Sequence, residues 1–123
     1  MKRFLKSVFF ALNGIRAVFK SERNFKIHIF AMVIVILMGL YLEISSQTWG
    51  LVIFSIGFVL IAELFNTAVE RLGDETSNGK QRQRVKNAKD ISAGAVLISA
   101  LTALTIGIIF LLVPFVQRIL ALI

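Results

Sequence analysis

The chain has no cysteine, one histidine (His28) and only 7 acidic residues among its 123. The lack of cysteine excludes disulfides, thiolate metal sites and a cysteine nucleophile. A single histidine excludes most catalytic or metal clusters that are built on several imidazoles. Neither common glycine-rich nucleotide motif, Gly-x-x-x-x-Gly-Lys-Ser/Thr or Gly-x-Gly-x-x-Gly, occurs in the sequence. Any nucleotide site is therefore of neither type.

Hydrophobic residues make up 57% of the chain and are gathered in continuous runs. A soluble domain of this length could not bury so much apolar surface, because small domains leave a large share of their surface exposed. Runs of roughly 20 apolar residues instead match the thickness of a bilayer core. The sequence therefore predicts an all-α integral membrane protein with one domain, residues 1–123. We expect an amphipathic surface helix at about 2–20 and spans at about 27–44, 49–72 and 88–116.

The distribution of basic residues indicates the orientation in the membrane. Of the 14 Lys and Arg residues, seven lie between Lys2 and Lys26, six between Arg71 and Lys89, and the last is Arg118. Positive charge is kept on the cytoplasmic side, so the N-terminus and the loop after the second span are predicted to be cytoplasmic. We attribute the net charge of +7 to flanks that face anionic lipid and expect no nucleic-acid partner.

Apolar residues recur at three- and four-residue spacing in the first 20 residues. This pattern is typical of a helix that lies in the membrane interface, and it also fits a helix packed at the entry of the bundle. Ser21 is expected to cap the helix that follows, with Asn24 as a second candidate. The apolar positions are Phe4, Leu5, Val8, Leu12, Ile15 and Phe19.

Glu63, Asn66 and Glu70 share one face of the second predicted span, because they stand at positions i, i+3 and i+7 of a helix. The two carboxylates are roughly 10 Å apart along the helix axis. Ionisable groups inside a bilayer cost about 2.5–3.5 kcal/mol each, so they are candidates for function. Lys89 and Asp90 stand at the mouth of the third span, near the same membrane surface.

Carboxylates, an amide and a lysine at one membrane surface suit phosphate chemistry. Mg²⁺ binds through one or two carboxylates together with substrate phosphates, and lysine supplies a compact charge for phosphate oxygens. Glu63, the acid nearest the membrane, would face a lipid head and accept a proton from its hydroxyl, while Glu70 would face a water-soluble phosphate donor. A structural polar seam between packed helices explains these residues equally well.

The segment Glu-Leu-Phe-Asn-Thr-Ala-Val-Glu at 63–70, followed by Asp74 and by Ala-Lys-Asp at 88–90, resembles the prokaryotic diacylglycerol kinase family. Residues 22–28 resemble the N-terminal motif of its undecaprenol-kinase branch, and the resemblance covers nearly the whole chain. It implies a homotrimer of the bacterial inner membrane with composite active sites between subunits. It also implies transfer of the γ-phosphate of ATP to the primary hydroxyl of undecaprenol or diacylglycerol at the cytoplasmic surface.

The resemblance further implies roles for individual residues. Glu63 resembles the general base, and Glu22 and Glu70 resemble the Mg²⁺ ligands. The positions that resemble ATP-binding residues are Arg3, Phe10, Asn66, Asp74, Lys89 and Asp90, and those that resemble lipid-binding residues are Arg3, Glu63 and Ala93.

Three departures from the family pattern bear on specificity. Phe10 stands where the family commonly has a tyrosine able to hydrogen-bond. Ala93 replaces a serine of the diacylglycerol-specific branch, which favours undecaprenol or relaxed lipid choice. The loop at 75–86 lacks the acidic-aromatic-His stretch of the Gram-negative enzymes, so the adenine and ribose contacts are not assigned.

Two other classes of protein remain open at this point. A small multidrug transporter also carries a membrane glutamate, but it has four spans with the acid in the first. Here three spans are predicted, and the acids lie in the second. A non-catalytic structural subunit of a membrane complex would need no such cluster of polar residues.

Overall fold

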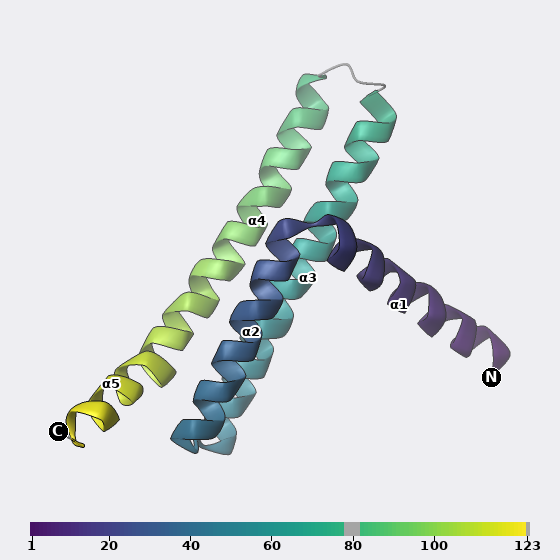
Figure 1. The fold of residues 1–123 in the computed structure, drawn as a ribbon. Coiled ribbons are helices and arrows are strands. Elements are labelled where there is room, and N and C mark those ends of the chain that lie inside the picture. Colours follow the sequence, from purple (N-terminus) through teal and green to yellow (C-terminus); the bar gives the residue numbers. More distant parts are fainter. Residues whose placement is uncertain (78–81, 123) are drawn as a thin grey trace.

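The computed structural model describes residues 1–77 and 82–122, and in these it contains helices and no strand (Figure 1). The elements are α1 (Lys2–Ser21), α2 (Arg23–Leu42), α3 (Ser46–Ser77), α4 (Gln83–Gly107), a π-helical turn η1 (Ile108–Leu112) and α5 (Val113–Leu120). Three stretches are long and apolar enough to cross a membrane: Arg23–Leu42, Ser46–Thr76 and Gln83–Leu120. The predicted class, an all-helical membrane protein with several spans, is confirmed.

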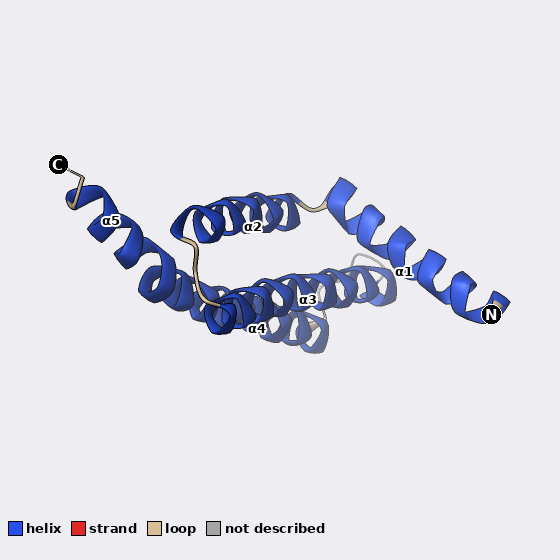
Figure 2. Cartoon of the chain, turned by 90° about the horizontal axis from the view of Figure 1, so that it is seen from below, coloured by secondary structure: helices blue, strands red, loops and turns tan. Residues whose placement is uncertain are grey.

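α3 is the central helix of the bundle. It packs along α4 and has fewer contacts with α2. In Figure 2, α2 lies apart from the α3–α4 pair. α1 leaves the bundle at its junction with α2 and points away from it (Figure 1). The large exposed apolar surface of the spans, for example Phe54 and Phe65 at 71% each, is what a helix facing lipid or another copy presents.

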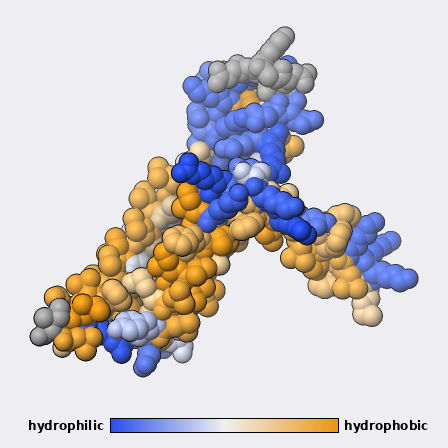
Figure 3. All heavy atoms as spheres, in the orientation of Figure 1, coloured by the Kyte–Doolittle hydropathy of each residue, from blue (hydrophilic) through white to orange (hydrophobic). Residues whose placement is uncertain are grey.

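Polar and apolar side chains are separated along the bundle axis (Figure 3). Hydrophilic side chains gather where α3 and α4 extend beyond the α1–α2 junction, and apolar side chains cover most of the remaining length of the bundle. This boundary is what a helix pair presents when it emerges from a bilayer into water. The residues predicted to be functional on α3 and α4 lie at and beyond this boundary.

A single extended residue, Glu22, divides α1 from α2, with φ −93° and ψ 120°. The prediction that Ser21 caps α2 is wrong, since Glu22 is the N-cap and no side chain bonds the first amides of α2. α1 runs on through Ser21, so its hydroxyl turns back and lies 3.1 Å from the carbonyl oxygen of Ala17. The junction is held instead by contacts to α3, described below.

The last span continues past Pro114, because the chain forms a π-helical turn just before it. Proline lacks an amide donor, and a π-turn shifts the hydrogen-bond register so that the helix continues. α5 then reaches α2, where an Arg118 guanidinium nitrogen donates to the carbonyl oxygen of Tyr41 at 3.2 Å. The same guanidinium lies 5.1 Å from the centre of the Tyr41 ring. These two contacts join the ends of α2 and α5, at the end of the bundle that lies opposite its polar end.

Candidate active site

Glu63 lies on α3 and is almost fully buried, with 3% of its surface exposed. Its Oε2 atom has no hydrogen-bond partner among residues 1–77 and 82–122. Buried polar atoms in native proteins are nearly always paired, so an orphaned carboxylate oxygen points to a ligand or to chemistry. Asn66 and Thr67, on the next turn of α3, are also buried, at 8% and 3% exposed. A buried polar group therefore lies where α3 passes from the apolar to the polar end of the bundle.

The Asn66 side chain connects this buried group to α4. Its amide nitrogen donates to Glu70 Oε1 at 3.0 Å, and its amide oxygen accepts from the Ser92 hydroxyl at 2.7 Å. The Ser92 oxygen also lies 2.8 Å from the carbonyl oxygen of Lys89. Both ends of the amide are thus satisfied, which fixes its orientation. Through Asn66, α4 sets the direction of the Glu70 carboxylate.

Lys89 crosses from α4 to α3 and forms an ion pair with Asp74. Gly73 makes room for this crossing: a Cβ atom there would lie 2.9 Å from both Lys89 Cε and Val85 Cγ1. At Gly73, α3 and α4 therefore lie too close together to leave room for a larger side chain. This contact holds the lysine ammonium close to the polar face that carries Glu70.

The Glu22 carboxylate is tied to α3 by a basic residue. Its Oε1 atom lies 3.3 Å from an Arg71 guanidinium nitrogen and 2.7 Å from the Ser21 hydroxyl, which itself accepts from Arg71 at 2.6 Å. Arg71 follows Glu70 directly in the sequence. The α1–α2 junction is therefore pinned beside the turn of α3 that carries Glu70.

Glu22 and Glu70 are the two carboxylates that the family resemblance implies as magnesium ligands. In the described residues no three His, Cys, Asp or Glu side chains form a cluster able to hold a metal ion. Each of the two carboxylates uses Oε1 in the hydrogen bonds above. Mg²⁺ keeps several waters and binds through one or two carboxylates together with substrate phosphates, so a pair of carboxylates is a sufficient donor set.

Other residues singled out from the sequence are not brought to Glu63 in this chain. Arg3 and Phe10 lie exposed on α1, which points away from the bundle (Figure 1). Phe10 contacts its own helix, with Lys6 Nζ 5.8 Å from the ring centre. Asp90 and Ala93 are exposed on α4. Residues 78–81 of the 75–86 loop, where the adenine and ribose contacts were left open, lie outside the described residues.

The structure adds three residues that the sequence reasoning missed: Ser92, Gly73 and Arg71. Ser92 follows Lys89 by three positions, so its place on the same helix face could have been read from the spacing. Gly73 lies inside a helix, where glycine is unfavourable and indicates close packing. Nothing in the sequence marks Arg71 as the partner of Glu22, because their pairing depends on how α1 and α2 meet α3.

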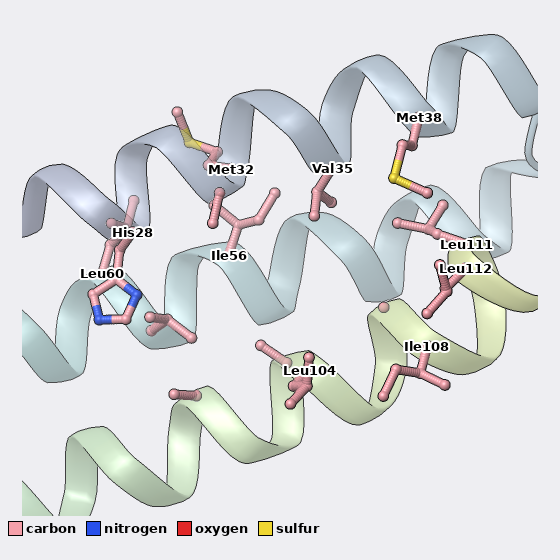
Figure 4. Close-up of a pocket in the computed structure, with 15 residues that line it drawn as sticks. His28, Met32, Val35, Met38, Ile56, Leu60, Leu104, Ile108, Leu111 and Leu112 are labelled. Carbon is pink, nitrogen blue, oxygen red and sulfur yellow. The ribbon is translucent and has the colours of Figure 1, made fainter. Parts of the chain in front are cut away.

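An apolar cleft of about 340 Å³ runs between α2 and α4, with α3 as its floor (Figure 4). Met32, Val35 and Met38 of α2 face Leu104 and Ile108 of the last span across it. His28 and Leu60 lie together at one end (Figure 4). Glu63 follows Leu60 by three residues and so stands on the next turn of the same face. The cleft therefore leads to the turn that carries the orphaned carboxylate.

Comparison with known proteins identifies similar sequences over most of this length. The model of the family described as prokaryotic diacylglycerol kinase matches residues 9–111. The chain is 36% identical over 112 residues to undecaprenol kinase from Bacillus subtilis, covering 91% of this chain and 90% of that protein. It is 36% identical over 110 residues to a diacylglycerol kinase from Synechocystis sp., covering 89% of this chain and 63% of that longer protein. Diacylglycerol kinase from Escherichia coli strain K12 is 28% identical over 101 residues, 82% of each chain.

Proposed function

This chain belongs to the prokaryotic diacylglycerol kinase family, and we therefore propose that it is a lipid kinase that transfers the γ-phosphate of ATP to the primary hydroxyl of a membrane lipid alcohol. The observation that carries the proposal is the buried Glu63 carboxylate, whose Oε2 atom has no partner among the described residues and which lies one helical turn beyond Leu60 in the wall of the apolar cleft. A carboxylate in this position is suited to accept the proton of a hydroxyl whose apolar chain stays in the membrane.

The phosphate donor would bind on the polar side of Glu63. Lys89 offers an ammonium group for phosphate oxygens and would exchange its contact with Asp74 for them. Glu22 and Glu70 would hold Mg²⁺, which when bound neutralises the charge that develops on the transferring phosphoryl group. Asn66 keeps Glu70 in place for that role. Asp90 and Arg3 remain proposed nucleotide contacts on the evidence of the resemblance alone.

The apolar chain of the acceptor would lie in the cleft between α2 and α4. The cleft is lined by aliphatic and thioether side chains, and it ends at His28 beside the turn of Glu63. Ala93 offers no hydroxyl to a polar lipid head. We therefore expect undecaprenol to be phosphorylated at least as well as diacylglycerol, in agreement with the similarity to an undecaprenol kinase.

We further propose a homotrimer in the bacterial inner membrane, with α1 in the cytoplasmic interface. α3 presents an exposed apolar stripe at Phe54, Phe58, Ile61 and Phe65, whose four- and three-residue spacing suits packing between identical helices. In such an assembly α1 of one subunit would bring Arg3 and Phe10 to the site of its neighbour. This accounts for their distance from Glu63 in the single chain.

The other functions that the sequence left open are not favoured. A small multidrug transporter needs four spans, whereas the described residues provide three stretches long enough to cross. A structural subunit would not require the Asn66–Glu70 and Lys89–Asp74 contacts at the membrane surface.

A transfer assay tests the proposal. Purified protein in detergent is incubated with Mg²⁺, γ-labelled ATP and either undecaprenol or diacylglycerol, and the lipid phosphate is separated and counted. We expect label in the lipid with both acceptors and at least equal catalytic efficiency with undecaprenol. Label that never enters lipid would overturn the function, and a tenfold preference for diacylglycerol would overturn the lipid assignment alone.

A further inference from the structure

The single histidine of the chain lies on a different helix from Glu63, at the end of the cleft that is next to the turn of Glu63. His28 is on α2, is partly buried, and lines the end of the cleft that lies next to the turn of Glu63 (Figure 4). Leu60 of α3 lies beside it at this end of the cleft (Figure 4). Because Glu63 follows Leu60 by one helical turn on the same face, His28 and Glu63 stand at the same end of the cleft, on two different helices.

The two side chains have complementary hydrogen-bonding capacity that they do not use on each other. Within residues 1–77 and 82–122 the ion pairs are Arg71–Glu22 and Lys89–Asp74, so His28 and Glu63 form none. In the same part of the chain Glu63 Oε2 has no hydrogen-bond partner. A carboxylate only accepts hydrogen bonds, whereas a neutral imidazole donates from one nitrogen and accepts at the other. A hydroxyl group placed between them can donate to Glu63 and accept from His28.

We propose that His28 binds the acceptor hydroxyl of the lipid alcohol opposite Glu63, so that the hydroxyl is held between α2 and α3 at the end of the cleft. This inference rests on the proposed function and adds a residue to its site. The hydroxyl oxygen accepts from the imidazole N–H, its hydrogen points to Glu63 Oε2, and its second lone pair stays free for phosphorus. On transfer, the proton passes to Glu63, the new oxygen–phosphorus bond forms, and the bond from the γ-phosphorus to ADP breaks.

Such a pair of groups also gives selectivity for an alcohol over a lipid without one. A lipid that lacks the hydroxyl would fill the cleft but leave the buried carboxylate and the imidazole unpaired. Sites built to hydrogen-bond a hydroxyl discriminate strongly against the analogue that lacks it, for this reason. A histidine that only packs against the cleft wall would bind both lipids equally.

The test is a binding comparison between a lipid alcohol and its deoxy analogue, each titrated into the detergent-solubilised protein. The wild type should bind the alcohol at least about tenfold more tightly, since two hydrogen bonds are lost in the analogue. His28→Phe and His28→Ala remove the donor and should abolish most of this preference while leaving affinity for the deoxy lipid within about threefold. His28→Gln, which keeps an N–H donor, should restore much of the preference. Tyr41→Phe, a polar-to-apolar change at the far end of α2, is the matched control.

Steady-state kinetics give a second readout. The donor-free variants should raise KM for the lipid alcohol about tenfold with KM for ATP unchanged, and His28→Gln should recover part of the loss. Equal losses of affinity for alcohol and deoxy lipid, or no loss in either variant, would overturn the inference. A wild type that binds the alcohol selectively but phosphorylates no lipid would overturn the proposed function and leave the role of His28 in binding intact.

Discussion

Asn66 of α3 and Ser92 of α4 are joined by a hydrogen bond of 2.7 Å, and the same Asn66 side chain donates to Glu70 at 3.0 Å. Ser92 on α4 thus fixes the Asn66 side chain, and through Asn66 it orients the Glu70 carboxylate on α3. Because the amide of Asn66 is largely buried, a change at either neighbour leaves a polar atom without its partner.

Ser92→Ala removes the donor to the Asn66 amide oxygen, so we expect a loss of about 1 kcal/mol in stability and a weaker, misaligned Glu70. Nucleotide affinity should fall several-fold, as measured by titration of Mg-ATP. Ser99→Ala is the control, because Ser99 is also buried on α4 but its hydroxyl bonds only the carbonyl oxygen of Val96 in its own helix. Equal effects of the two changes would contradict a specific role for Ser92.

Gly73→Ala should disturb the site without touching a polar group. The added Cβ would lie 2.9 Å from Val85 Cγ1 and from Lys89 Cε, so these side chains must shift, and Lys89 is the partner of Asp74. We expect a destabilisation of roughly 1–3 kcal/mol, typical of overpacking, and weaker ATP binding. Gly94→Ala serves as the control, since nothing lies within 4 Å of a Cβ there. Thermal unfolding in detergent and ATP titration measure the two effects, and equal behaviour of both variants would contradict the argument.

Glu22→Gln and Arg71→Gln separate metal binding from helix anchoring. Both changes break the Glu22–Arg71 ion pair, but only the first removes a carboxylate proposed to hold Mg²⁺. Glu22→Gln should therefore raise the Mg²⁺ concentration needed for half-maximal activity by about tenfold or more, as loss of a ligand does. Direct titration with Mn²⁺ should show the same loss of affinity. If Arg71→Gln weakens metal binding as much, Glu22 acts only as an anchor.

The orientation in the membrane can be tested at the chain ends. Basic residues flank the polar end of the bundle, and Arg118 is the single one near the other end. A reporter fused after residue 123 should therefore be active only outside the cytoplasm, and one fused before residue 1 only inside. A cytoplasmic C-terminal reporter would contradict the three-span orientation.

The helical architecture was predictable from the sequence because it depends on local patterns. Apolar runs indicated the three spans, and the spacing of residues 63, 66 and 70 indicated their shared face. The clustering of Glu63, Asn66 and Glu70 needs only the geometry of one helix. The end of the last span was less predictable, since a π-turn before Pro114 lets the helix continue to Leu120.

Contacts between helices could not be read in the same way. Pairing of Glu22 with Arg71 depends on the angle at which α1 and α2 meet α3, and the sequence carries no signal for it. Ser21 looked like a helix cap, but the helix boundary falls one residue later. The orphaned oxygen of Glu63 is likewise a property of packing, since its burial arises only when the helices come together.

The central claim is that Glu63 receives the proton of the lipid hydroxyl while Glu70 serves the nucleotide. The decisive measurement compares lipid phosphate formation and Mg-ATP affinity in Glu63→Gln and Glu70→Gln, with assembly of both variants checked in detergent. Glu63→Gln should reduce transfer by at least about a hundredfold, as loss of a general base does, and leave Mg-ATP affinity near that of the wild type. Glu70→Gln should lose Mg-ATP affinity as well as transfer. Lost ATP affinity in Glu63→Gln with unchanged affinity in Glu70→Gln would reverse the roles, and near-normal transfer by Glu63→Gln would contradict the account.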